Sequence, residues 1–135
     1  MKGTYDHQVQ YYETDAMKIV HHANYLRWFE EARMYGIEKE GFPYQELEQR
    51  GILIPVLSAS CDYKIAVTFG KTVHIDYELE SFKGLRFTIA YRVYSEDRAI
   101  LHAEGKTTHC FLNREMKPIN IKKEAPDLYA CFSQD

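Results

Sequence analysis

The fold of this chain is decided by residues 24–40, which read NYLRWFEEARMYGIEKE. Asn24 is a candidate N-cap, because its side chain can accept a hydrogen bond from a free N–H group of a first helical turn. Gly41 and Pro43 follow the segment and favour a helix end there. Apolar or small residues recur inside the segment at helical spacing, namely Tyr25, Phe29, Ala32 and Gly36, widened by Trp28 and Tyr35. The segment therefore predicts one helix of about four turns.

The other side of this predicted helix is polar. Its charged residues are Arg27, Glu30, Glu31, Arg33, Glu38 and Lys39. An apolar face this wide, opposed by a charged one, is typical of a helix that a sheet largely covers.

The segments on both sides of the helix alternate between apolar and polar residues, as half-buried strands do. One such segment precedes the helix, at residues 5–12, and three follow it, at residues 73–80, 87–93 and 99–112. We also expect one long or bent strand over 52–67 and a short helical turn over 44–50. Tight turns at 82–85 and 96–97 join consecutive strands, so these strands must be antiparallel. We expect an α+β protein in which an antiparallel sheet wraps around one long central helix.

Length and composition set the outer limits. The chain has 135 residues, of which 45% are hydrophobic and 27% charged, so we expect a single domain over 1–135 with a core of its own. Its three cysteines form no CxxC pair, which favours a reducing cytoplasm. The formal net charge of −3 gives no general attraction to nucleic acid. No apolar run is long enough for a membrane span.

Residues 11–33 contain the candidate catalytic residues, and the alternating pattern of a strand does not account for them. Glu13 and Asp15 form an acidic break between a strand and the helix, and His21 and His22 stand just before the helix start. A helix N-terminus offers unpaired N–H groups to an oxyanion. Each feature also has an ordinary alternative, since Asp15 fits a turn aspartate and the histidine pair fits a hydrogen-bonded surface pair. The pair lacks the further ligands that a metal site needs.

The stretches 13–17 and 19–33 closely resemble the signature of the 4-hydroxybenzoyl-CoA thioesterase family, and especially its acyl-CoA thioesterase branch found beside the Tol–Pal genes. The matching pattern is Asp15, His22 seven positions later, and then Asn24-Tyr25 on the helix. The resemblance implies a hotdog fold and an enzyme that hydrolyses an acyl-CoA thioester to a free acid and CoA. It implies no metal and no cofactor, because CoA is part of the substrate.

The resemblance also assigns roles. Asp15 is expected as nucleophile or general base, flanked by Tyr11 and His22, with a backbone N–H near His22 polarising the thioester carbonyl. For the CoA phosphates, the candidates are Lys64 and Lys71, with solvated surface lysines as the alternative. Hotdog active sites form between two copies, so a homodimer or homotetramer is expected.

One departure from the family pattern stands in the acidic segment, where Lys18 occupies a position that usually carries Gly. If that glycine serves a positive φ, lysine strains or reshapes the loop, and if it only leaves space, lysine narrows the acyl entrance. Three other functions stay open: a thioesterase for carrier-protein-bound acyl groups, a non-catalytic acyl-CoA-binding protein, and a hotdog dehydratase. The dehydratase fits least, because the chain has no His-Phe-Pro motif.

Overall fold

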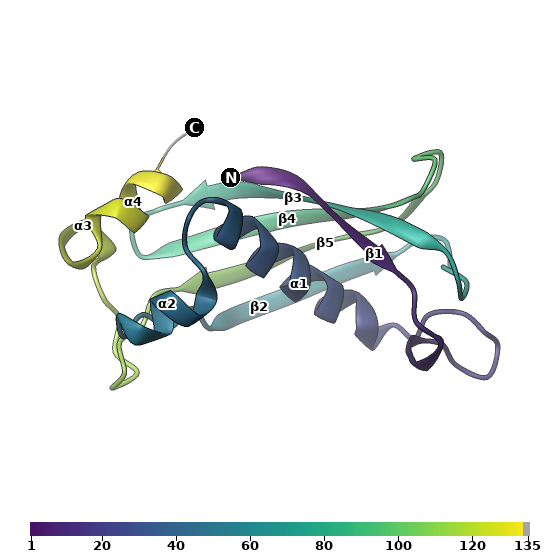
Figure 1. Ribbon diagram of the computed structural model, residues 1–135, viewed down its shortest axis with the longest axis horizontal. Helices are drawn as coiled ribbons and strands as arrows, with labels where there is room; N and C mark the ends of the chain where they lie inside the picture. The colour runs from purple at the N-terminus through teal and green to yellow at the C-terminus, as the bar shows by residue number, and fades with distance from the viewer. Residues whose placement is uncertain (134–135) are drawn as a thin grey trace.

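The computed structural model describes residues 1–133 and arranges them as one sheet with a long helix against it (Figure 1). The strands are β1 (Lys2–Gln8), β2 (Val56–Tyr63), β3 (Thr72–Phe82), β4 (Arg86–Ser95) and β5 (Leu101–Cys110). The helices are α1 (Ala23–Lys39), α2 (Tyr44–Gln49), α3 (Ile121–Glu124) and α4 (Pro126–Phe132), and η1 (Tyr11–Glu13) is a short 3-10 turn.

The sheet has the strand order β1-β3-β4-β5-β2, and every neighbouring pair is antiparallel. One row of paired residues crosses all five strands, from Gly3 through Tyr77, Tyr91 and Gly105 to Cys61. The sheet thus places β1 and β2, which flank α1 in the sequence, at its opposite edges.

Helix α1 lies across one face of this sheet (Figure 1). Trp28, Phe29 and Ala32 are completely buried there, and the Phe29 ring stacks on Tyr91 at a centroid distance of 4.4 Å. The approach is close because Gly105 has no side chain, and a Cβ on it would meet the Phe29 ring at 2.7 Å. Burial of each large side chain contributes about 2 kcal/mol, so this contact holds the helix on the sheet.

The predicted α+β class is confirmed, and so is the burial of Tyr25, Phe29 and Ala32 under the sheet. The short helix after α1 and both tight turns also occur where the sequence predicts them. None of the helices in the described range is long and apolar enough to cross a membrane.

Several element boundaries differ from the prediction. Strand β1 ends at Gln8 rather than residue 12, because the Val9 amide bonds to Lys71 and the chain then turns into η1. The long strand predicted over 52–67 is regular only over β2. Helices α3 and α4 were not predicted, since they are too short for a helical period to stand out.

Two side chains of α1 behave differently from the prediction. Asn24 is not the N-cap: it lies inside the first turn, buried, and its side-chain amide donates to the carbonyl of Glu13 at 2.8 Å. Arg33, predicted on the polar face, is only 8% exposed and donates to the Tyr91 hydroxyl at 3.4 Å. It begins a buried polar row, which consists of Arg33, Tyr91, Thr107 and His109.

Candidate active site

The site loop (residues 14–22) joins η1 to α1 and is closed by its own backbone. Thr14 and Val20 form a bridge, the Asp15 amide donates to the Ile19 carbonyl at 2.9 Å, and the Lys18 amide donates to the Asp15 carbonyl at 2.9 Å. The Asp15 carboxylate accepts a hydrogen bond from the Met17 amide at 2.8 Å and is exposed. The loop therefore presents Asp15 to solvent on a defined turn.

Lys18 completes this turn with a φ of 64°. This is the left-handed region, which glycine occupies freely and a side chain occupies only with strain. Of the two explanations for the usual glycine here, positive φ therefore applies. The chain keeps the turn with lysine and carries the strain in the backbone.

The amides at the start of α1 are almost all used. Asn24 donates to the His21 carbonyl at 3.0 Å, Tyr25 to the His22 carbonyl at 3.3 Å, and Ala23 to the His21 ring at 3.2 Å. The His22 amide, by contrast, has no acceptor among residues 1–133. A free N–H at the positive end of a helix is a favourable place for a developing negative charge.

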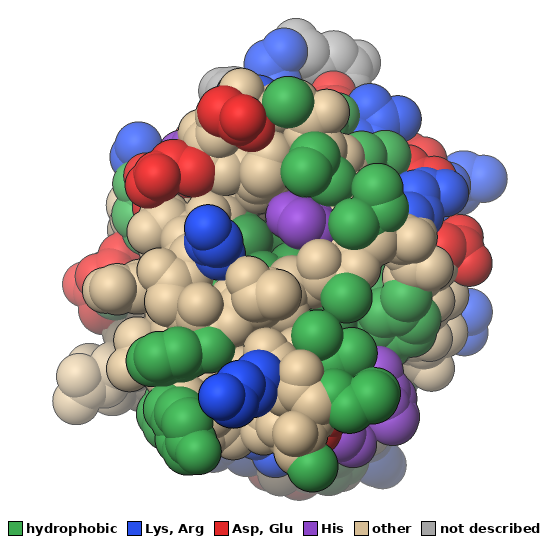
Figure 2. All heavy atoms as spheres, turned by 90° about the vertical axis from the view of Figure 1, so that its right-hand side faces the viewer, with side chains coloured by type: hydrophobic (Ala, Val, Ile, Leu, Met, Phe, Trp, Pro, Cys, Tyr) green, Lys and Arg blue, Asp and Glu red, His purple; other side chains and the backbone are tan. Residues whose placement is uncertain are grey.

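Tyr11 lies in η1, and Asp15 and His22 lie in the site loop that follows it, at one end of the molecule (Figure 1). Tyr11 is 71% exposed and meets Phe69 edge-on at 5.5 Å, while the His22 ring stacks on His21 at 4.2 Å. Within the described part of the chain, no hydrogen bond joins Asp15 to His22 or to Tyr11. Figure 2 shows this end, where hydrophobic and histidine side chains gather.

A small pocket of about 180 Å³ opens beside His22. Its lining includes Ile19, Val20, His22, Tyr25, Tyr63 and Lys64. Burial raises the pKa of Tyr25 to about 12, which keeps its hydroxyl protonated. The Tyr63 hydroxyl donates to the His22 carbonyl at 3.1 Å and fixes the rim. The pocket is apolar enough to receive part of an acyl group.

The two lysines predicted to contact CoA lie apart. Lys64 lines the small pocket and lies 3.5 Å from the Glu104 carboxylate. Lys71 lines a different, open cavity of about 750 Å³ between the β2–β3 connection and the β4–β5 turn. Of the two, Lys64 is therefore the one near His22.

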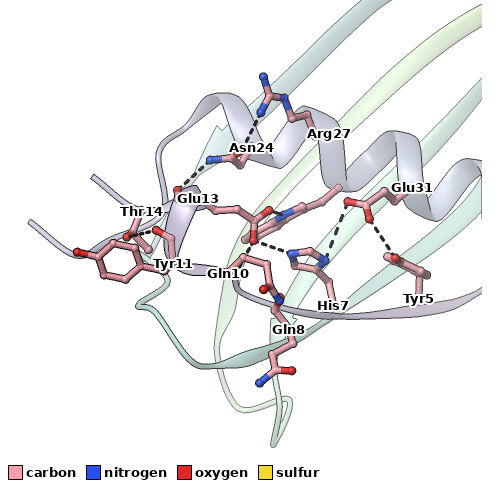
Figure 3. A network of polar contacts seen from close by, with 11 residues as sticks. Tyr5, His7, Gln8, Gln10, Tyr11, Glu13, Thr14, Asn24, Arg27 and Glu31 are labelled. Carbon is pink, nitrogen blue, oxygen red and sulfur yellow. Dashed lines mark hydrogen bonds and ion pairs between the residues drawn. The ribbon is translucent and has the colours of Figure 1, made fainter. Parts of the chain in front are cut away.

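The sequence places Glu13 in the acidic break beside Asp15 but assigns it no role. It is 4% exposed, and its carboxylate accepts from His7 Nε2 at 2.8 Å, the Gln10 amide at 2.8 Å and Trp28 Nε1 at 2.7 Å (Figure 3). Burial raises the pKa of Glu13, but these hydrogen bonds outweigh it and hold the pKa below the ordinary value. The signal in the sequence was the place of Glu13 in the acidic break and in the stretch 13–17 that carries the family resemblance.

Comparison with known families identifies the chain. The model of the thioesterase-like superfamily matches residues 9–128. The chain belongs to this superfamily. YneP of Bacillus subtilis is 33% identical over 94% of this chain and 92% of its own length. The acyl-CoA thioesterase YbgC of Haemophilus influenzae is 29% identical over 87% of this chain and 86% of its own length.

Solved structures agree with the superfamily. A DHNA-CoA thioesterase from Staphylococcus aureus superposes with a TM-score of 0.93 and 30% identity, covering 98% of this chain and 89% of that one. The hotdog fold and the prediction of a thioester hydrolase are thereby confirmed. The narrower resemblance to the Tol–Pal branch stays a prediction.

No group of three or more His, Cys, Asp and Glu side chains in residues 1–133 is arranged to hold a metal ion. The expectation that the thioesterase needs no metal and no cofactor stays a prediction.

Proposed function

We propose that this protein hydrolyses acyl-CoA thioesters to a free acid and CoA at the site loop. The observation that carries the proposal is the His22 amide at the start of α1, which has no acceptor among residues 1–133 and lies on the same loop as the exposed Asp15. A thioester carbonyl that accepts a hydrogen bond from this amide lies beside the site loop, which also carries Asp15.

The chemistry follows from the charges involved. Attack on the thioester moves negative charge onto the carbonyl oxygen, and a fixed N–H at a helix N-terminus stabilises that charge. Asp15 either attacks the carbonyl carbon, giving a mixed anhydride that water then opens, or removes a proton from the attacking water. In both routes the C–S bond breaks, and CoA leaves as the thiol after taking up a proton. Tyr11 and His22 flank the reacting groups.

The acyl group and CoA take different parts of the surface in this proposal. The small pocket lined by Tyr25 and Tyr63 receives the acyl end beside His22. Lys64 and Lys71 are proposed to contact the CoA phosphates by charge.

We also propose that two or more copies assemble, with the site completed across the interface. Strand β2 is an edge of the sheet, and Val56 and Leu57 on it are about half exposed, at 51% and 46%. An edge strand of this kind is a ready surface for pairing with a second copy. Light scattering should find a dimer or tetramer, and a monomer with full activity would contradict this.

The deciding experiment measures release of free thiol from a panel of acyl-CoA esters with short aliphatic, long aliphatic and aromatic acyl groups. Turnover of at least one ester that depends on Asp15 supports the proposal. Tight binding of the panel without thiol release would indicate an acyl-CoA-binding protein instead. Turnover only of acyl groups attached to a carrier protein would show that the substrate is a carrier-protein thioester and not an acyl-CoA.

A further inference from the structure

We propose that Glu13 is a positioning residue of the active site, whose buried side chain and carbonyl fix the place of Asp15 relative to the start of α1. The inference rests on the proposed function, because it concerns the geometry of the groups assigned there.

The Glu13 side chain connects three separate parts of the chain. Its carboxylate accepts from His7 in β1, from the Gln10 amide before η1, and from the Trp28 indole in α1 (Figure 3). Trp28 itself is fully buried under the sheet. The carboxylate is therefore tied to the buried core through Trp28.

The Glu13 backbone holds the other end of the site loop. Its carbonyl accepts from the His21 amide at 2.8 Å and from the Asn24 side chain at 2.8 Å. One residue thus anchors both the beginning of the loop and the two positions that bracket His22. Asp15 lies two residues beyond this anchor, and among the described residues its carboxylate has only the Met17 amide as a hydrogen-bond partner.

A carboxylate is needed here, and an amide would not replace it. The three donors around Glu13 share two acceptor oxygens, whereas a glutamine would supply one oxygen and turn an NH₂ group against at least one donor. A core of this kind does not by itself require a buried charge, because apolar residues of similar size in place of the whole group, carboxylate and side-chain donors together, are often as stabilising. A buried carboxylate with three converging donors specifies one arrangement of the loop, and that arrangement serves the site.

The test compares Glu13→Gln with Asp76→Asn, a change of the same kind in β3, outside the groups assigned to the site. Asp76 is also a carboxylate held by charge-assisted bonds, to Thr4 at 2.6 Å and to Arg98 at 2.9 and 3.0 Å. For each folded variant, kcat and KM are measured with the acyl-CoA ester that the panel turns over fastest, together with the melting temperature. We expect Glu13→Gln to lower kcat by about 10- to 100-fold with KM within about twofold, because a small displacement of a catalytic group has effects of this size. Asp76→Asn should lower the melting temperature and leave kcat unchanged.

A double variant separates positioning from other roles. In an Asp15→Asn background, Glu13→Gln should lower kcat no further, because there is no catalytic carboxylate left to position. An equal reduction in both backgrounds would overturn the inference, and so would a folded Glu13→Gln protein with wild-type kcat. If Asp15→Asn itself keeps full turnover, the proposed chemistry fails first and Glu13 has nothing to position.

Trp28→Phe provides a second route if Glu13→Gln does not fold. This change removes one of the three donors to the carboxylate and keeps most of the buried ring. We expect a smaller reduction of kcat, about 10-fold, again with KM unchanged. A folded Trp28→Phe protein with wild-type kcat would contradict the positioning role.

Discussion

In the site loop (residues 14–22), the Asp15 carboxylate faces solvent and has a single hydrogen-bond donor within residues 1–133. In the buried polar row under α1, Thr107 bonds to the Tyr91 hydroxyl at 2.7 Å and to His109 Nε2 at 2.7 Å, and both Thr107 and His109 are at most 3% exposed. The row keeps polar groups satisfied with one another, whereas the loop leaves a carboxylate and an amide available to an outside molecule. Substitutions in the loop should therefore change turnover, and substitutions in the row should change stability.

The sharpest way to break this contrast is Asp15→Asn. The change is nearly isosteric and removes charge and basicity, so kcat should fall by about two to four orders of magnitude. The melting temperature and binding of a non-hydrolysable acyl-CoA analogue should stay close to wild type. A lower melting temperature with unchanged kcat would make Asp15 a structural turn residue.

His22 allows the amide to be tested apart from the side chain. Its φ of −55° suits proline, which lacks the N–H, whereas His22→Ala keeps it. We expect His22→Pro to lower kcat by about 100- to 1000-fold, the scale seen when an oxyanion donor is lost. His22→Ala should have a much smaller effect. Equal losses in the two variants would remove the amide from the mechanism.

The buried row should instead reveal itself in the pH dependence of stability. Burial, followed by the nearby Arg33 charge, lowers the pKa of His109 to about 4. The unfolded chain binds the proton near pH 6.5, so stability should fall as pH drops from about 6.5 to 4, by about 3 kcal/mol in total. Urea unfolding of wild type and His109→Gln at several pH values measures this contribution.

The comparison with His109→Gln is needed because other groups also titrate. A hydrogen bond to Asp6 raises the pKa of His74, which adds stability at low pH and loses it as pH rises through the raised value. Glu13, with its lowered pKa, adds a further loss as pH falls below about 4.5. The difference in the free energy of unfolding between wild type and His109→Gln isolates the contribution of His109. Identical dependence on pH in the two proteins would show that the fold does not disfavour protonation of His109.

Lys18→Gly tests whether the positive φ in the site loop lowers the stability of the protein. Relief of the positive φ should raise the free energy of unfolding by about 1 kcal/mol. Met116→Gly is the matched control, because Met116 has a φ of 62° in an exposed turn of a different loop. Both variants should become more stable, while only Lys18→Gly can alter turnover. An unchanged free energy of unfolding in Lys18→Gly would mean that the loop carries no strain.

The smallest expected effect concerns the lysines. Charge reversal at Lys64 or Lys71 should raise KM by about threefold and leave kcat nearly unchanged, because contacts far from the thioester supply uniform binding. The effect should shrink as salt is added. Unchanged KM in both variants would indicate that Lys64 and Lys71 are solvated surface lysines without a role in CoA binding.

Helix α1 and its covering sheet were predictable because their signals are periodic. A stripe that includes Phe29 and Ala32, followed by alternating strands, leaves few alternative arrangements. The cap at Asn24 was predicted wrongly, because local sequence favours a cap there but the partner is the carbonyl of Glu13, which only the folded chain brings near. Arg33 was predicted on the exposed face for a similar reason. A charged residue is usually exposed, and its buried partner, the Tyr91 hydroxyl, lies far away in the sequence.

The sequence by itself determined the fold class, the family resemblance around Asp15 and His22, and the long helix that follows them. Only the tertiary structure decided that Lys18 has positive φ, that the His22 amide has no acceptor in the described part of the chain, and that Glu13 is buried among three donors. The physical reason is range. Periodicity and capping act between residues a few positions apart, whereas burial and hydrogen-bond satisfaction depend on atoms brought together from β1, η1 and α1.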